Sequence, residues 1–187
     1  MKLLLILSIL ITSIFALTKD EIPKTMQEKI NQAVFILQKD NNKSAANKLF
    51  DIFDPVFDYE LMARLSLSKA YNKLNKEEKI AFNEAFEAHL KKSFVDKLTL
   101  YKNENIKIIK NENIKKRYFL TGAMLINGKN QNIIFKFSEK NNNWLIYDID
   151  IFGISIIQSY RSQFADLLDN ADFDTLLKTL NKTTFDK

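Results

Sequence analysis

The chain of 187 residues contains no cysteine, one histidine and three scattered glycines. Without cysteine it cannot form disulfides, thiol nucleophiles, iron–sulfur clusters or cysteine-ligated zinc sites. A single histidine argues against a metal site with two histidine ligands. The glycines form neither a G-x-G-x-x-G nor a G-x-x-x-x-G-K-[ST] pattern, which excludes dinucleotide-binding and P-loop folds. We therefore expect no metal site and no cofactor.

The chain also has little excess of positive over negative charge. Lysine plus arginine exceed aspartate plus glutamate by 28 to 23, and the two signs are mixed along the chain. This balance argues against a nucleic-acid partner and is compatible with a weak preference for anionic surfaces. The apolar fraction of 46% and the charged fraction of 27% are those of an ordinary globular protein, and the length favours one domain.

The first residues have the composition of an export signal. Lys2 precedes the apolar run Leu3–Ala16, which as a helix would span only about 21 Å, short of the ~30 Å bilayer core. We interpret residues 1–16 as a signal peptide and residues 17–187 as a single exported domain without stable membrane insertion. A short membrane anchor is the alternative. An exported chain without cysteine fits a bacterial periplasm.

Helical periodicity occupies both ends of the remaining chain. Thr18 and Glu21 have capping-box spacing, and apolar residues then recur every three or four positions up to Leu37. Asn75 similarly precedes the longest expected helix, which carries a phenylalanine-rich face. The expected helices are about 18–37, Ala45–Phe53, Tyr59–Leu67, 75–101, a segment from Ser155 to Leu167, and a short one from Phe173 to Leu180.

Strand patterns occupy the middle of the chain. β-branched and aromatic runs bounded by asparagine predict strands at Ile106–Ile109, Tyr118–Ile126, Asn132–Phe137 and Trp144–Ile151. Asn127-Gly128 between two of these runs indicates a tight hairpin. Helices, then four strands, then helices predict an α+β fold with a curved four-stranded antiparallel sheet. Together with the helices, such a sheet forms a cone that can hold a ligand.

Groups able to perform catalysis are few. His89 adjoins the apolar face of the longest helix, and we expect it to be partly buried and structural. Asp148 and Asp150 lie on one strand face and could act as a carboxylate pair or as calcium ligands. A solvent-facing strand edge is the simpler interpretation. The chain is thus predicted not to be an enzyme; a cone-fold enzyme using Asp148 or Asp150 is the alternative.

Two segments resemble a known family. The first is Phe57-Asp58-Tyr59-Glu60-Leu61-Met62-Ala63-Arg64-Leu65-Ser66-Leu67, followed by the phenylalanine-rich helix face. The second is Trp144-Leu145-Ile146-Tyr147-Asp148-Ile149, then Phe152-Gly153-Ile154-Ser155 and Ser159-Tyr160-Arg161-Ser162-Gln163-Phe164. Together they are similar to the MlaC (toluene-tolerance) family of periplasmic phospholipid-binding proteins. Departures from the family pattern occur at Ser68, Tyr71, Phe94 and Phe152.

The resemblance implies a carrier that takes one phospholipid between the outer and inner membranes and so maintains lipid asymmetry. Its implied partners are an outer-membrane lipoprotein–porin complex and an inner-membrane ABC transporter with an MCE-domain subunit. Bound phospholipid would be a ligand and not a cofactor. Such a carrier needs a long apolar cavity and little chemistry, which agrees with a composition rich in phenylalanine.

The expected lipid-binding side chains come from the aromatic and aliphatic faces of the helices and strands. In particular, we expect the strand face with Phe135 to lie opposite the helix face with Leu90. Arg161 should point away from the cavity and act as a structural ion-pair or partner-contact residue. Asn42, in an N-x-[ST] sequon, is a candidate glycosylation site on a helix–helix loop. The predicted lipid-binding residues are Phe57, Leu61, Leu65, Phe86, Leu90, Phe94, Ile133, Phe135, Phe137, Tyr147, Ile149 and Phe164.

Overall fold

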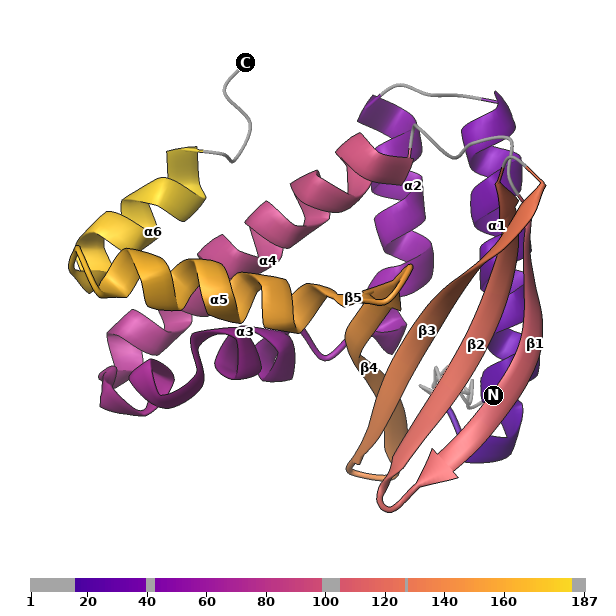
Figure 1. The fold of residues 1–187 in the computed structure, drawn as a ribbon, viewed down its shortest axis with the longest axis horizontal. Coiled ribbons are helices and arrows are strands. Elements are labelled where there is room, and N and C mark those ends of the chain that lie inside the picture. The colour runs from indigo at the N-terminus through magenta and orange to yellow at the C-terminus, as the bar shows by residue number, and fades with distance from the viewer. Residues whose placement is uncertain (1–15, 40–42, 99–104, 127, 183–187) are drawn as a thin grey trace, which may run out of the picture.

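A computed structural model describes residues 16–39, 43–98, 105–126 and 128–182 of the chain (Figure 1). Apart from Ala16, the predicted signal peptide lies outside the described residues. The same holds for Asn42 and for Tyr101, at the predicted end of the longest helix. None of the helices in the described part is long and apolar enough to cross a membrane.

The helices agree with the sequence patterns in number and order. Thr18 and Glu21 form the predicted capping box, although it opens the 3₁₀ turn η1 (Lys19–Glu21) before the first α-helix begins. Asn75 and Glu78 likewise exchange hydrogen bonds of 2.8 Å at the start of the longest helix. The α-helices are α1 (Ile22–Lys39), α2 (Lys43–Phe53), α3 (Tyr59–Leu67), α4 (Lys76–Leu98), α5 (Ile156–Leu168) and α6 (Phe173–Lys182), with further 3₁₀ turns η2 (Asp54–Val56) and η3 (Ser68–Lys73).

The sheet is an antiparallel meander of five strands in the order β1-β2-β3-β4-β5. The α+β class is confirmed, but there is one more strand than predicted. The extra strand, β5, is short and pairs with the end of β4 through a tight turn at Phe152 and Gly153, both at positive φ. The strands are β1 (Ile106–Ile114), β2 (Arg117–Ile126), β3 (Lys129–Lys140), β4 (Asn143–Ile151) and β5 (Ile154–Ser155).

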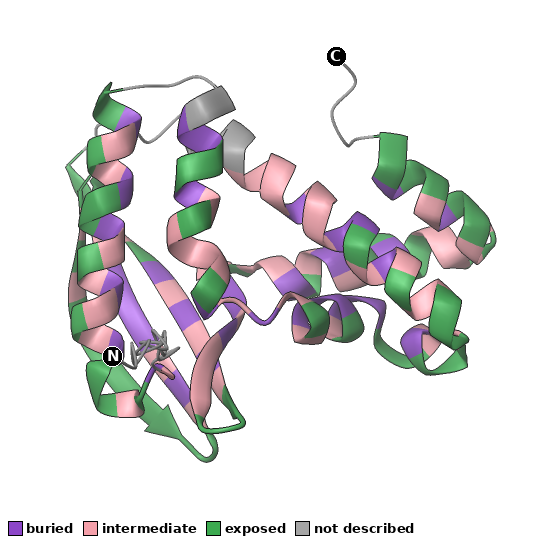
Figure 2. Cartoon of the chain, turned by 180° about the vertical axis from the view of Figure 1, so that it is seen from behind, coloured by how far each residue is buried: buried purple, intermediate pink, exposed green. Residues whose placement is uncertain are grey.

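The first hydrophobic cluster lies between the sheet and α1. Figure 2 shows α1 and α2 in front of one sheet face, with buried positions of α1 turned toward the strands. Met26 and Ile30 of α1 pack there with Leu120 of β2, Phe137 of β3 and Ile146 of β4. Burying side chains of this size stabilises the fold by about 1.5–3 kcal/mol each. We call this group the sheet cluster.

The second cluster lies among the other helices. In Figure 1, α3, α4, α5 and α6 form a separate group beside the sheet. Phe82 and Phe86 of α4 are fully buried and contact Phe164 of α5 edge to face, with ring centroids 5.9 and 6.2 Å apart. Leu176 and Leu180 of α6 complete the packing. We call this group the helical cluster.

A β-bulge in β4 changes which side chains face the sheet cluster. Phe137 of β3 pairs with Ile146, whereas the preceding Lys136 pairs with Asp148, so Tyr147 is the extra residue. Ile146 and Ile149 both face the cluster despite their odd spacing. Tyr147 instead stacks against the Arg117 guanidinium, 4.1 Å from its ring centroid. The alternation of side chains between the two sheet faces is therefore interrupted at the bulge in β4.

Candidate functional site: an aromatic seam and its groove

The two clusters meet at Phe57 and Phe94, with Ile156 of α5 also packed against both. Phe57 and Phe94 are half-buried, and both pack against the sheet cluster and the helical cluster. Their ring centroids lie 6.2 Å apart, and Phe53 contacts Phe57 edge to face at 6.5 Å. We call Phe53, Phe57 and Phe94 the aromatic seam.

Backbone pairing explains why Phe57 lies at this boundary. Phe57 forms an isolated bridge with Ile146 of β4, and the Asp58 N–H donates to the Ile146 carbonyl oxygen at 2.9 Å. The Asp58 carboxylate then caps α3 by accepting from the Leu61 N–H at 3.0 Å. The segment between η2 and α3 is thus fixed to the sheet edge at one end and to the helical group at the other.

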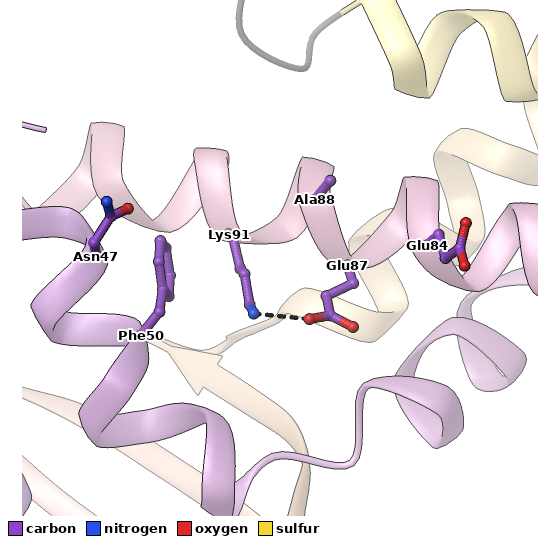
Figure 3. Close-up of a pocket in the computed structure, with 6 residues that line it drawn as sticks. All are labelled: Asn47, Phe50, Glu84, Glu87, Ala88 and Lys91. Atoms are coloured by element: carbon purple, nitrogen blue, oxygen red, sulfur yellow. Dashed lines mark ion pairs between the residues drawn. The ribbon is translucent and has the colours of Figure 1, made fainter.

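A groove of about 410 Å³ lies between α2 and α4, at the low end of small-molecule pockets. Figure 3 shows side chains from α2 on one side and from α4 on the other. Phe50 of α2 and Ala88 of α4 line it with apolar side chains, whereas its charged groups come from α4. The lining residues are Asn47, Phe50, Glu84, Glu87, Ala88 and Lys91.

Lys91 connects this groove to the aromatic seam. Its ammonium forms ion pairs with Asp54 of η2 at 2.6 Å and with Glu87 at 2.7 Å. It also lies 5.3 Å from the Phe50 ring centroid and 4.8 Å from that of Tyr59. Tyr59 in turn stacks on Phe57 with centroids 5.2 Å apart.

The carboxylates around Lys91 control its protonation. Burial alone would lower the pKa of Lys91, but its hydrogen bonds to Asp54 and Glu87 outweigh that effect, and the pKa is raised. Burial, reinforced by a hydrogen bond to Asp54, raises the pKa of Tyr59. Tyr59 therefore remains a neutral donor to the Asp54 carboxylate, at 2.7 Å. Lys91 is a permanent cation within an acidic surrounding.

The predicted lipid-binding residues are divided between the two clusters. We expected the Phe135 strand face to lie opposite the Leu90 helix face, but only Phe94 of that helix face packs against the sheet cluster. That prediction was wrong because the buried face of α4 meets other helices. The sheet cluster includes Ile133, Phe135, Phe137 and Ile149, and the helical cluster includes Phe86, Leu90 and Phe164, with Leu65 packed against it. Phe57 and Phe94 belong to the aromatic seam. The half-buried side chains of Leu61 and Tyr147 lie outside both clusters and the seam.

The carboxylates of Asp148 and Asp150 are both held by hydrogen bonds from neighbouring parts of the fold. Asp148 is buried and accepts from the Lys136 ammonium and the Ser155 hydroxyl, each at 2.8 Å, and from the Ile157 N–H at 3.2 Å. The expected solvent-facing edge is thus wrong for Asp148. Asp150 accepts from the Gly153 N–H at 2.7 Å in the β4–β5 turn. Neither carboxylate lines the groove, and the described residues hold no cluster of potential metal ligands.

His89 and Arg161 are both built into the helical group. The His89 ring packs edge to face on Tyr160, with centroids 5.6 Å apart, in agreement with the predicted partly buried position. Arg161 of α5 donates to the Leu65 carbonyl oxygen of α3 through Nε and a terminal nitrogen, at 3.0 and 2.9 Å. Arg161 is therefore structural, but it binds a backbone carbonyl and not a carboxylate.

The groove was missed at the level of sequence. Glu87 and Lys91 have i,i+4 spacing, which indicates a helix-surface ion pair and gives no sign of a groove. Phe50 and Phe53 are three apart on α2, which predicts a shared face but not what it meets. Only the packing of α2 beside α4 brings these side chains together.

Comparisons with known proteins identify the family. The family model described as MlaC protein matches residues 24–182. A phospholipid-binding protein from Ralstonia solanacearum, solved in complex with a phospholipid, has a similar fold with a TM-score of 0.75 at 16% sequence identity. The alignment covers 87% of this chain and 96% of that one. The curated proteins include no match. The chain belongs to the MlaC protein family.

Proposed function

We propose that this protein is a phospholipid carrier that encloses acyl chains at the aromatic seam, between the sheet cluster and the helical cluster. The observation that carries the proposal is that Phe57 and Phe94 are half-buried and pack against both clusters. Two apolar bodies bridged by the rings of Phe57 and Phe94 and by the side chain of Ile156 can separate along that boundary and admit acyl chains. Membership of the MlaC family and the phospholipid-bound relative support this assignment.

The energetics require enclosure of the ligand. At about 0.8 kcal/mol per buried methylene, exposing two acyl chains to water would cost on the order of 20 kcal/mol. A shuttling carrier must therefore cover most of that surface with its own apolar side chains. The sheet cluster and the helical cluster provide such walls, and the carrier needs no catalytic group.

The cellular role follows from the family resemblance. We propose that residues 1–16 direct export to the periplasm and that residues 17–187 act there as one domain. The carrier then receives and delivers lipid at an outer-membrane lipoprotein–porin complex and an inner-membrane ABC transporter with an MCE-domain subunit. In this role it maintains lipid asymmetry of the outer membrane.

Native mass spectrometry of the full chain, expressed with its own N-terminus and purified without detergent, tests the proposal. We expect a complex heavier than the processed protein by the mass of one diacyl phospholipid. Denaturing the same sample should release that lipid and leave the bare chain. A bare chain in the native spectrum, and no uptake from added vesicles, would contradict the carrier function.

A further inference from the structure

The hairpin formed by β1 and β2 carries most of the excess positive charge of the chain. Residues 105–126 contain five cations against one carboxylate, a formal charge of +4, whereas the whole chain has a net charge of +5. The rest of the chain is therefore nearly neutral. We call residues 105–126 the basic hairpin. Its charged residues are Lys107, Lys110, Lys115, Lys116, Arg117 and Glu112.

Most of these lysines are not neutralised within the fold. Lys107, Lys115 and Lys116 are exposed, and none of them forms an ion pair with another described residue. Lys110 is paired with Glu112 on the same strand, at a nitrogen–oxygen distance of 2.9 Å. The basic hairpin therefore presents a positive potential that an external anionic surface can meet.

The basic hairpin also exposes large apolar side chains. Six large hydrophobic residues are exposed in the described part of the chain, and three of them lie here, Ile109 at 57%, Ile114 at 45% and Leu125 at 58%. Lysines on an edge strand such as β1 prevent its pairing with another chain, but aliphatic side chains exposed at that edge favour association. Protection of the edge therefore does not explain the combination of the two.

Cations and aliphatic side chains occur together on the sheet face opposite α1. The register pairs Ile114 with Arg117 and Lys110 with Thr121, and paired residues place their side chains on the same face. Leu120 faces the sheet cluster, so Arg117 and Thr121, at odd spacings from it, face the other side. Figure 1 shows β1 and β2 in front of α1, and no helix of the described residues lies across this outer face.

We infer that the basic hairpin binds the surface of an anionic phospholipid bilayer, with its lysines at the headgroup phosphates and its exposed aliphatic side chains in the interface. A bilayer interface accepts both kinds of side chain, whereas a partner that recognises charge alone leaves the aliphatic ones in water. The inference goes beyond the proposed carrier function, to which it adds a membrane contact. The hairpin contains none of the residues of the aromatic seam, so the two sites can be tested separately.

Sedimentation with vesicles tests the inference. Protein expressed with its own N-terminus is mixed at low ionic strength with vesicles of phosphatidylglycerol and phosphatidylcholine in equal amounts, or of phosphatidylcholine alone. We expect binding to the anionic vesicles, much weaker binding to the neutral ones, and release in 1 M salt, where the screening length is about 3 Å. Lys115→Gln combined with Lys116→Gln should weaken binding by about 25-fold, or about five-fold for each lysine. Ile114→Thr should weaken it by a few-fold, because less apolar surface enters the interface.

Lys69→Gln combined with Lys73→Gln is the matched control, because both lysines are exposed in η3, outside the basic hairpin. This control removes the same charge and should keep the wild-type binding. All variants have the same N-terminal residues, so a difference between them reports on the hairpin.

Equal loss of vesicle binding in both double variants, or no binding of the wild type to anionic vesicles, would overturn the membrane contact and leave an acidic protein surface as the alternative occupant. Lipid occupancy in native mass spectra reports on the carrier function independently. It should be the same in the wild type and in the Lys115→Gln, Lys116→Gln protein, and a bare chain in both would reject the carrier function without affecting the vesicle result.

Discussion

Lys136 of β3 and Asp148 of β4 form an ion pair with a nitrogen–oxygen distance of 2.8 Å on adjacent strands. Asp148 is 5% exposed, and its carboxylate also accepts hydrogen bonds from the Ser155 hydroxyl and from the Ile157 N–H at the start of α5. This carboxylate therefore joins the sheet to the helical group, which is a structural role and not a catalytic one.

Asp148→Ala should destabilise the fold by about 3 kcal/mol, because it leaves the Lys136 charge and two further donors without their partner. Asp150→Ala removes one backbone hydrogen bond at a partly exposed site and should cost about 1 kcal/mol or less. Urea unfolding of both variants measures the difference. Equal stability of the two would contradict the assigned role of Asp148.

Arg161→Ala should lower the free energy of unfolding by about 2 kcal/mol, because the guanidinium supplies both hydrogen bonds to the Leu65 carbonyl oxygen. Lipid occupancy in native mass spectra should stay within a few-fold of the wild type, since Arg161 belongs to neither the seam nor the groove. Arg161→Lys is the control, because an ammonium can supply one hydrogen bond to the Leu65 carbonyl oxygen in place of two, and its loss of stability should be intermediate. Complete loss of lipid from a folded Arg161→Ala protein would show that Arg161 takes part in binding.

Acid should weaken the fold through His89. Burial, assisted by the charge of Lys92, lowers the pKa of His89 below its ordinary value of 6.5. The unfolded chain then binds a proton more readily than the folded one, so stability is full above the ordinary pKa of 6.5 and falls as the pH drops below it. His89→Gln should flatten this dependence in urea titrations at several pH values. An unchanged slope in the variant would assign the effect to other groups.

Phe94→Glu should abolish lipid binding while the protein remains folded, because a charge placed at the aromatic seam must be desolvated when acyl chains enter. Ile80→Glu is the matched control on the same helix, at a side chain that is already 50% exposed. Thermal melting checks the fold, and native mass spectrometry measures lipid occupancy. Retained lipid in folded Phe94→Glu would move the acyl-chain site away from the seam.

Local features of the fold were predictable because they depend on neighbours in the chain. The caps at Thr18 and Asn75 require only a side-chain oxygen and a glutamate three residues later. The β2–β3 hairpin requires only a short turn, and Gly128 takes the positive φ that this turn needs. The bulge at Tyr147 was not predictable, because it depends on the register against β3 and not on the composition of β4.

The α+β class, the order of the main elements, the apolar faces of the first and the longest helix and the resemblance to the MlaC family could all be inferred from the amino-acid pattern. Which apolar faces meet could be seen only in the folded chain. The periodicity of α4 shows that Phe86 and Leu90 share a buried face, but that face packs on α3, α5 and α6 and not on the sheet. The physical reason is that the hydrophobic effect is non-directional, so a pattern specifies burial without specifying the partner. The groove around Lys91 likewise exists because α2 and α4 are packed side by side, which brings Lys91 to 5.3 Å from the ring centroid of Phe50.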